Sequence, residues 1–151
     1  MSGSVTIRSR YGGRKIKLLS GEINKAKLQV GYFTTTPDYP DGTSVADVAT
    51  WQEYGTDTIP ERPFMRTTMT QNRDEYFRLM RSMLISIIRG RASSQRSIAT
   101  VALRIKNDIQ DSIIRWMTPP NAFSTEDKKG FNDPLVDTEH MLENVEWRIS
   151  R

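Results

Sequence analysis

The sequence predicts a domain of mixed helices and strands, the α+β class, built around two long helices. Apolar residues recur every three or four positions over residues 72–89 and 94–116, and this spacing gives each helix one apolar face. Only a few residues join the two stretches, so an antiparallel helical hairpin is favoured. Apolar and polar residues alternate over 144–149, which is typical of a half-buried strand. A length of 151 residues suits one domain spanning 1–151.

Short elements are expected before the two helices. Ser44 can cap a helix that Gly55 ends. Pro60 and Pro63 favour extended backbone, so 64–67 is predicted as a strand, at a sheet edge if the prolines join it. In order, we expect a strand at 5–8, a helix over 15–27, a strand at 28–33, a loop at 34–43, the helix from Ser44 and the strand at 64–67.

After the two helices, residues 118–134 are predicted to form a long loop rich in Pro, Asn, Lys and Gly. Loops of this length are usually functional or disordered. One or two helical turns over 137–142 and the strand at 144–149 complete the expected elements.

The composition excludes several chemistries. The chain has no cysteine and one histidine, His140. Disulfides, thiol catalysis, thiolate zinc sites and sites with several histidines are therefore excluded. No segment approaches the ~20 apolar residues of a membrane helix, and the first residues lack the apolar core of a signal peptide. We therefore expect a soluble protein made in the cytoplasm, with no membrane partner.

The net charge of +4 is unevenly distributed. Residues 1–27 hold seven basic residues and one acidic residue, whereas residues 28–151 hold 15 basic and 17 acidic residues. The basic N-terminal segment, 1–27, could contact nucleic acid phosphates. It could equally be a solvated arm or a contact to an acidic protein.

No convincing catalytic set is present. Asp133, Asp137 and Glu139 could form a Mg²⁺ cluster of the nuclease kind, but no other nuclease signature accompanies them. Asp108 and Asp111 fit a solvated charged helix face better than a site. We expect no enzyme activity, no catalytic or metal-binding residues and no cofactor.

Residues 39–66 carry the most information. Turn signals, aromatic residues, acidic residues and two arginines are concentrated there, and Trp, Tyr and Arg commonly anchor protein interfaces. The alternative is an ordinary helix-to-strand corner in which Trp51 and Phe64 are core residues. The candidate interface residues are Trp51, Glu53, Tyr54, Arg62, Pro63 and Phe64.

At these residues the sequence resembles the tail-completion, or head–tail joining, family of tailed bacteriophages, also described as virion morphogenesis or minor tail proteins. The matching motifs, in order, are Val30-Gly31-Tyr32, Gln52-Glu53-Tyr54-Gly55-Thr56, Ile59-Pro60-Glu61-Arg62-Pro63-Phe64 and Pro134-Leu135-Val136-Asp137-Thr138. Glu139 departs from the pattern, because the family commonly has glycine after Asp-Thr.

The resemblance implies an antiparallel sheet of about four strands packed against two long antiparallel helices. It also implies a structural ring in the virion neck, located between the head–tail connector and the tail terminator or tail tube, with packaged double-stranded DNA passing through the lumen. Six copies are favoured and twelve are the alternative. Ring contacts would be heterologous. The basic segment could line the DNA channel or meet an acidic partner through Arg8, Arg10, Arg14, Lys15 and Lys17.

Two other hypotheses remain open on the sequence alone. The first is a small, sequence-independent DNA-binding protein that uses residues 1–27. The second is the Mg²⁺-dependent nuclease that would use the acidic residues near Asp133 and Asp137.

Overall fold

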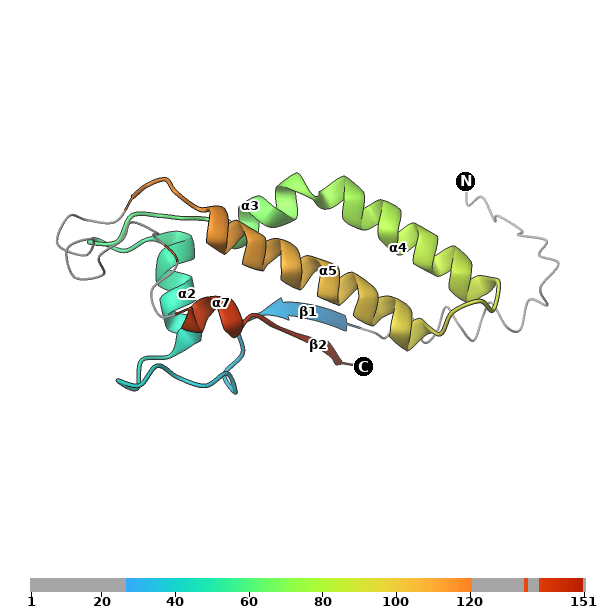
Figure 1. Ribbon diagram of the computed structural model, residues 1–151, viewed down its shortest axis with the longest axis horizontal. Coiled ribbons are helices and arrows are strands. Elements are labelled where there is room, and N and C mark those ends of the chain that lie inside the picture. The colour runs from blue at the N-terminus through green and yellow to red at the C-terminus, as the bar shows by residue number, and fades with distance from the viewer. Residues whose placement is uncertain (1–26, 121–134, 136–138, 151) are drawn as a thin grey trace, which may run out of the picture.

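The computed structural model describes residues 27–120, 135 and 139–150. Five helices and two strands lie in these residues (Figure 1). In chain order they are β1 (Lys27–Gly31), α2 (Val45–Tyr54), α3 (Phe64–Gln71), α4 (Arg73–Ile88), α5 (Ser94–Arg115), α7 (His140–Glu143) and β2 (Glu146–Ser150).

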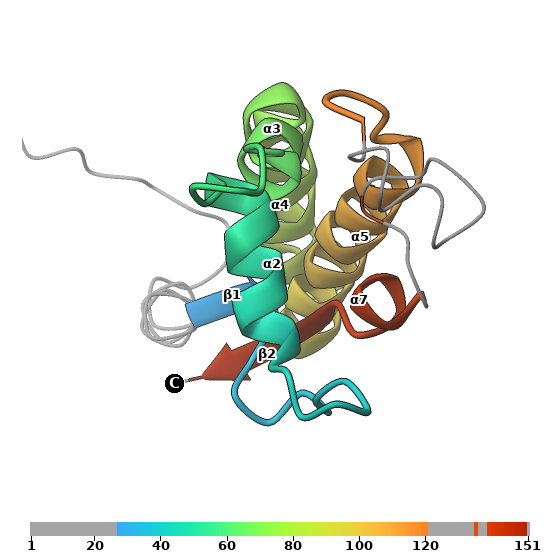
Figure 2. The same ribbon diagram turned by 90° about the vertical axis from the view of Figure 1, so that its left-hand side faces the viewer.

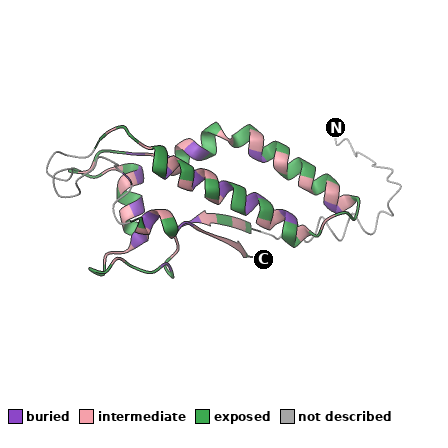
Figure 3. Cartoon of the chain, in the orientation of Figure 1, coloured by how far each residue is buried: buried purple, intermediate pink, exposed green. Residues whose placement is uncertain are grey.

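Helix α5 is the centre of the fold. It pairs with α4 in a long hairpin and also packs against α3, α7 and both strands (Figures 1 and 2). Its apolar face is buried at Val101, Ile105, Ile109 and Ile113. The Ser93 side chain begins the helix by accepting a hydrogen bond from the Arg96 N–H at 3.3 Å. Burial therefore follows one stripe along α5, while much of the surface of α4 is exposed (Figure 3).

Strands β1 and β2 form an antiparallel pair in which Leu28 lies opposite Ile149 and Val30 lies opposite Trp147. Leu28 and Val30 pack against the core that α5 organises. The pair joins segments more than 100 residues apart in sequence and places α7 beside α2 (Figure 2).

The predicted fold class is wrong. In the described part of the chain the sheet has two strands, not about four, and α4 and α5 are two of five helices. Residues 64–67 begin α3 instead of forming a strand. Proline is tolerated at the start of a helix, where its missing N–H has no intrahelical partner to bind, so Pro63 precedes α3 without interrupting it.

The other expectations fall in three groups. Helices α2, α4 and α5 occupy the stretches in which their patterns predict helices. Strands β1 and β2 begin or end within two residues of the predicted strands. The expected strand at 5–8 and nearly all of the helix over 15–27 lie outside the described residues, as do residues 121–134 of the long loop. Among the described helices, none combines the length and apolar character needed to cross a bilayer.

Candidate functional site

The two motifs from Gln52 to Phe64 fold into one corner, which joins the end of α2 to the start of α3. Gly55 ends α2 with a φ of 73°, a left-handed conformation that favours glycine. A Cβ at this position would lie 3.0 Å from the Glu61 nitrogen and from the Ile59 oxygen. Thr56 then closes the turn, because its hydroxyl accepts the Ile59 N–H at 3.0 Å. The corner therefore requires a residue without a side chain at Gly55.

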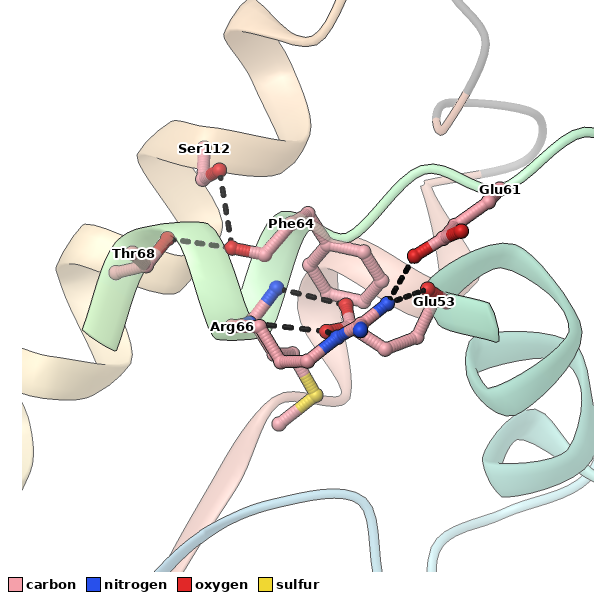
Figure 4. Close-up of polar contacts among 7 residues, drawn as sticks. Glu53, Glu61, Phe64, Arg66, Thr68 and Ser112 are labelled. Atoms are coloured by element: carbon pink, nitrogen blue, oxygen red, sulfur yellow. Dashed lines mark hydrogen bonds and ion pairs between the residues drawn. The ribbon is translucent and has the colours of Figure 1, made fainter. Parts of the chain in front are cut away.

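Glu53 caps α3 from the end of α2 (Figure 4). Its two carboxylate oxygens accept the N–H groups of Met65 and Arg66, each at 2.9 Å. The N-cap residue of α3 is Pro63, which has no side-chain oxygen to offer. A helix N-terminus has unpaired N–H groups and a positive dipole end, and the buried carboxylate satisfies both.

Arg66 ties the two sides of the corner together (Figure 4). Its Nε donates to Glu53 at 3.0 Å, and its NH2 group donates to the Glu53 carbonyl at 2.8 Å and to the Glu61 carboxylate. The guanidinium also lies 4.7 Å from the centre of the Tyr54 ring. The guanidinium therefore packs against the exposed Tyr54 ring while it binds Glu53 and Glu61.

Arg62 is a buried cation that binds neutral oxygen atoms. Its guanidinium donates to the Gln52 side-chain oxygen at 2.6 Å and to the carbonyls of Pro119 and Pro120, each at 2.9 Å. Its backbone N–H donates to the Gln52 carbonyl at 2.7 Å. Burial lowers the pKa of the Arg62 guanidinium below its ordinary value. Arg62 therefore fastens the segment after α5 to the corner.

Phe64 fills the core beneath the corner and is fully buried. Its carbonyl accepts the Thr68 hydroxyl at 2.7 Å and the Ser112 hydroxyl at 3.3 Å (Figure 4). The Ser112 contact connects α3 directly to α5.

The six candidate interface residues divide into two groups. Trp51 and Tyr54 are exposed, at 42% and 64%. Glu53, Arg62 and Phe64 are buried at 4% or less, and Pro63 is half-buried. The buried residues give the corner its shape, and Trp51 and Tyr54 are the large side chains that it leaves exposed. Arg8, Arg10, Arg14, Lys15 and Lys17 lie outside the described residues.

Sequence reasoning missed the residues that Arg62 and Glu53 bind. Gln52, Pro119 and Pro120 supply acceptors to Arg62, and Arg66 pairs with Glu53. Gln52 and Arg66 lie inside the information-rich segment, so their position was a usable signal. The carbonyls of Pro119 and Pro120 carry no sequence signal, because every residue has a carbonyl.

No group of three or more His, Cys, Asp or Glu residues in the described chain is arranged to hold a metal ion. Asp108 accepts hydrogen bonds from the Tyr76 hydroxyl and the Arg104 Nε, each at 2.9 Å, so it serves a structural network. Burial, followed by the Asp108 hydrogen bond, raises the pKa of Tyr76 above its ordinary value of 10.0. Asp133 and Asp137 lie outside the described residues.

Glu139, where the family pattern commonly has glycine, adopts a φ of 59°. This left-handed conformation is uncommon for residues with a Cβ and is the reason glycine is used at such positions. Glu139 therefore adopts a backbone conformation that glycine would adopt without strain.

A second surface feature is an apolar groove of about 420 Å³ between α4, α5 and β1. Phe77, Met80 and Leu84 line it and are 54%, 42% and 41% exposed. Exposed apolar side chains gathered in one place are typical of interaction surfaces.

No protein-family model matches the chain, and neither a curated protein sequence nor a solved structure matches it significantly.

Proposed function

We propose that this protein is a structural subunit of a bacteriophage neck, a tail-completion protein without enzymatic activity. It assembles into a ring, with six copies favoured over twelve, that joins the head–tail connector to the tail terminator or tail tube. The ring surrounds the packaged double-stranded DNA in the virion, and the subunits are made in the host cytoplasm.

The observation that carries the proposal is the corner formed by the motif residues. The residues on which the resemblance rests, from Gln52 to Phe64, form one unit through the contacts of Glu53 and Arg62. The left-handed backbone of Glu139 supports the same assignment from a separate part of the fold.

The surface also fits a subunit of an assembly. Trp51 and Tyr54 are exposed on this corner, and Trp and Tyr are frequent anchors of protein interfaces. The apolar groove that Phe77 and Met80 line adds exposed apolar area of the kind that assembly covers.

The experiment is genetic complementation in the phage genome that encodes the chain. Deletion of the gene should give filled heads and separate tails. The wild-type gene should restore joined particles, whereas the double variant Trp51→Ala/Tyr54→Ala should restore few. The matched control is Leu103→Ala, which removes a side chain that is 50% exposed on α5. Joined, infectious particles formed without the gene would refute the proposed function. Normal joining by the double variant would refute only the interface.

DNA binding through the basic N-terminal segment is the alternative function. Its candidate residues lie outside the described chain, so it rests on composition alone. Retention of duplex DNA at physiological salt, lost on removal of residues 1–26, would favour it.

A further inference from the structure

The chain contains two long stretches of opposite charge. Residues 28–61 hold six acidic residues and no basic residue, whereas residues 76–107 hold seven basic residues and no acidic residue. The acidic residues are Asp38, Asp41, Asp47, Glu53, Asp57 and Glu61. The basic residues are Arg78, Arg81, Arg89, Arg91, Arg96, Arg104 and Lys106. The near-neutral charge of residues 28–151 conceals this separation.

The fold places the two stretches at opposite ends of the molecule (Figure 1). Residues 34–61 form α2 and the loops on either side of it, at the left of the view. Most of α4, the turn after it and the first half of α5 form the helical hairpin, whose tip lies at the right. Helix α7 lies beside α2, so exposed Glu139 and Glu143 lie at the same end of the molecule.

Most of these charges are exposed and have no oppositely charged partner within the described residues. On the acidic end, Asp38, Asp41, Asp47 and Asp57 are exposed and form no ion pair with another described residue. Glu53 and Glu61 differ, because both bind Arg66. We call the four aspartates the acidic end.

The same holds along the helical hairpin toward its tip. Five exposed arginines form no ion pair with a described residue, whereas Arg104 binds Glu75 and Asp108. We call these five the basic tip: Arg78, Arg81, Arg89, Arg91 and Arg96.

The basic tip points away from the core. On α4, Tyr76 and Ile87 are the buried residues. Arg78 and Arg81 of α4, and Arg89 at its C-cap, follow at intervals of three and eight on the side away from them. The arginines are therefore outermost on the hairpin. Arg89 also suits its place at the negative end of the α4 dipole, but Arg78 and Arg81, within the helix, gain no such stabilisation.

We propose that the basic tip of one copy of this chain docks on the acidic end of the next copy. The inference rests on the proposed ring and names the contact that builds it. The unpaired charges at one end of the chain are opposite in sign to those at its other end. A second copy of the chain therefore supplies the partner that the basic tip lacks, and this favours a second copy over an unrelated anion. A contact between two different patches is heterologous, so it repeats from copy to copy and produces a closed ring or an open chain. Such contacts associate quickly and weaken with added salt.

The experiment measures self-association of the purified full chain by sedimentation and light scattering at low and physiological salt. Wild type should form oligomers that dissociate as salt rises. The tip variant, Arg81→Glu/Arg89→Glu, and the end variant, Asp38→Lys/Asp57→Lys, should each be monomeric under conditions in which wild type associates. The matched control, Arg73→Glu/Arg115→Glu, reverses two exposed arginines outside the tip and should associate like wild type.

Charge exchange makes the test specific. The tip and end variants, mixed in equal amounts, should associate again, because each then offers the patch that the other requires. A chain carrying all four reversals should also associate by itself. Circular dichroism checks that each variant is folded. If the tip variant does not fold, Arg81→Gln/Arg89→Gln takes its place and should weaken association at least tenfold.

Several results would overturn the inference. Wild type that stays monomeric at every salt concentration excludes the contact. If the tip variant and the end variant each associate like wild type, or if their mixture does not associate again, these two patches are excluded. If the tip variant associates normally but loses retention of a duplex DNA oligonucleotide, the tip is a nucleic-acid surface instead.

These outcomes are separable from failure of the proposed function. If the chain associates through these charges but its gene is dispensable for joining heads to tails, the contact is retained and the neck role is refuted. If joining requires the gene but tolerates both charge reversals, the neck role is retained and the contact is refuted.

Discussion

The backbone N–H and the guanidinium Nε of Arg66 donate to the same carboxylate oxygen of Glu53, over 2.9 and 3.0 Å. The second oxygen of Glu53 accepts the Met65 N–H. One carboxylate at the end of α2 thus caps α3 and pairs with its first basic side chain. The direction of the chain through the corner depends on this group, because Pro63 cannot cap α3 itself.

Replacing Glu53 should therefore be costly. Glu53→Ala leaves two N–H groups without their acceptor, and we expect the free energy of unfolding to fall by about 2–4 kcal/mol. Glu53→Gln retains one carbonyl acceptor and should lose less. Urea unfolding measures both, with exposed Glu143→Ala as the control. If Glu53→Ala and Glu143→Ala unfold at the same urea concentration, the cap contributes nothing.

The corner also shows what the sequence could and could not predict. The helices α4 and α5 were predictable because their apolar stripes are local patterns. The start of α3 was not, because its cap is supplied by Glu53, ten residues before the N-cap Pro63, and the prolines nearby favour a strand by local rules. The expected number of strands is wrong for the same reason, because residues 64–67, expected as a strand, begin α3.

The candidate site was predictable in position but not in role. Composition drew attention to residues 39–66, and the structure does place Trp51 and Tyr54 on the surface. Arg62 and Phe64 have the residue types of interface anchors, yet both are buried. Residue type alone cannot tell a partner contact from an internal one.

Arg62 should not tolerate lysine. Its planar guanidinium reaches three oxygen atoms, on Gln52, Pro119 and Pro120, and a single ammonium group cannot reproduce that geometry. We expect Arg62→Lys to lower the free energy of unfolding by about 2–3 kcal/mol, because buried acceptors are left unpaired. The control is Arg115→Lys, whose side chain is 80% exposed. If the two variants are equally stable in urea, the planar shape of the Arg62 guanidinium has no role in stability.

Gly55 and Gly90 form a natural comparison, because their φ angles are 73° and 70°. A Cβ on Gly55 would meet backbone atoms at 3.0 Å, whereas a Cβ on Gly90 would meet nothing within 4 Å. Gly90→Ala should cost only the left-handed strain, about 1–2 kcal/mol. Gly55→Ala should cost more, about 2–4 kcal/mol, because the turn must also shift. Thermal unfolding of both variants tests the difference, and equal losses would show that the corner has room.

Glu139 offers a stabilising substitution. Its φ of 59° strains a residue that carries a Cβ, and glycine removes this strain. Glu139→Gly should raise the free energy of unfolding by about 0.5–1 kcal/mol, after the greater freedom of glycine in the unfolded chain is subtracted. Glu139→Ala keeps the Cβ and is the matched control, with no gain expected. A loss of stability in the glycine variant would show that the Glu139 side chain stabilises the turn.

Stability should fall in alkaline solution because of two tyrosines, half-buried Tyr32 and buried Tyr76. Burial raises the pKa of Tyr32 and Tyr76 above the ordinary value of 10.0, and Tyr76 also donates to Asp108. Because the pKa of each tyrosine is higher in the folded state than in the unfolded chain, the neutral hydroxyl contributes to the free energy of unfolding. This contribution is complete below the unfolded pKa and is lost as pH rises above about 10. Tyr76→Phe cannot ionise at this position, so its free energy of unfolding should fall less steeply above that pH, and Tyr32→Phe/Tyr76→Phe should be flatter still. Urea unfolding at a series of alkaline pH values measures the slopes, and a double variant with the wild-type slope would exclude both tyrosines as its origin.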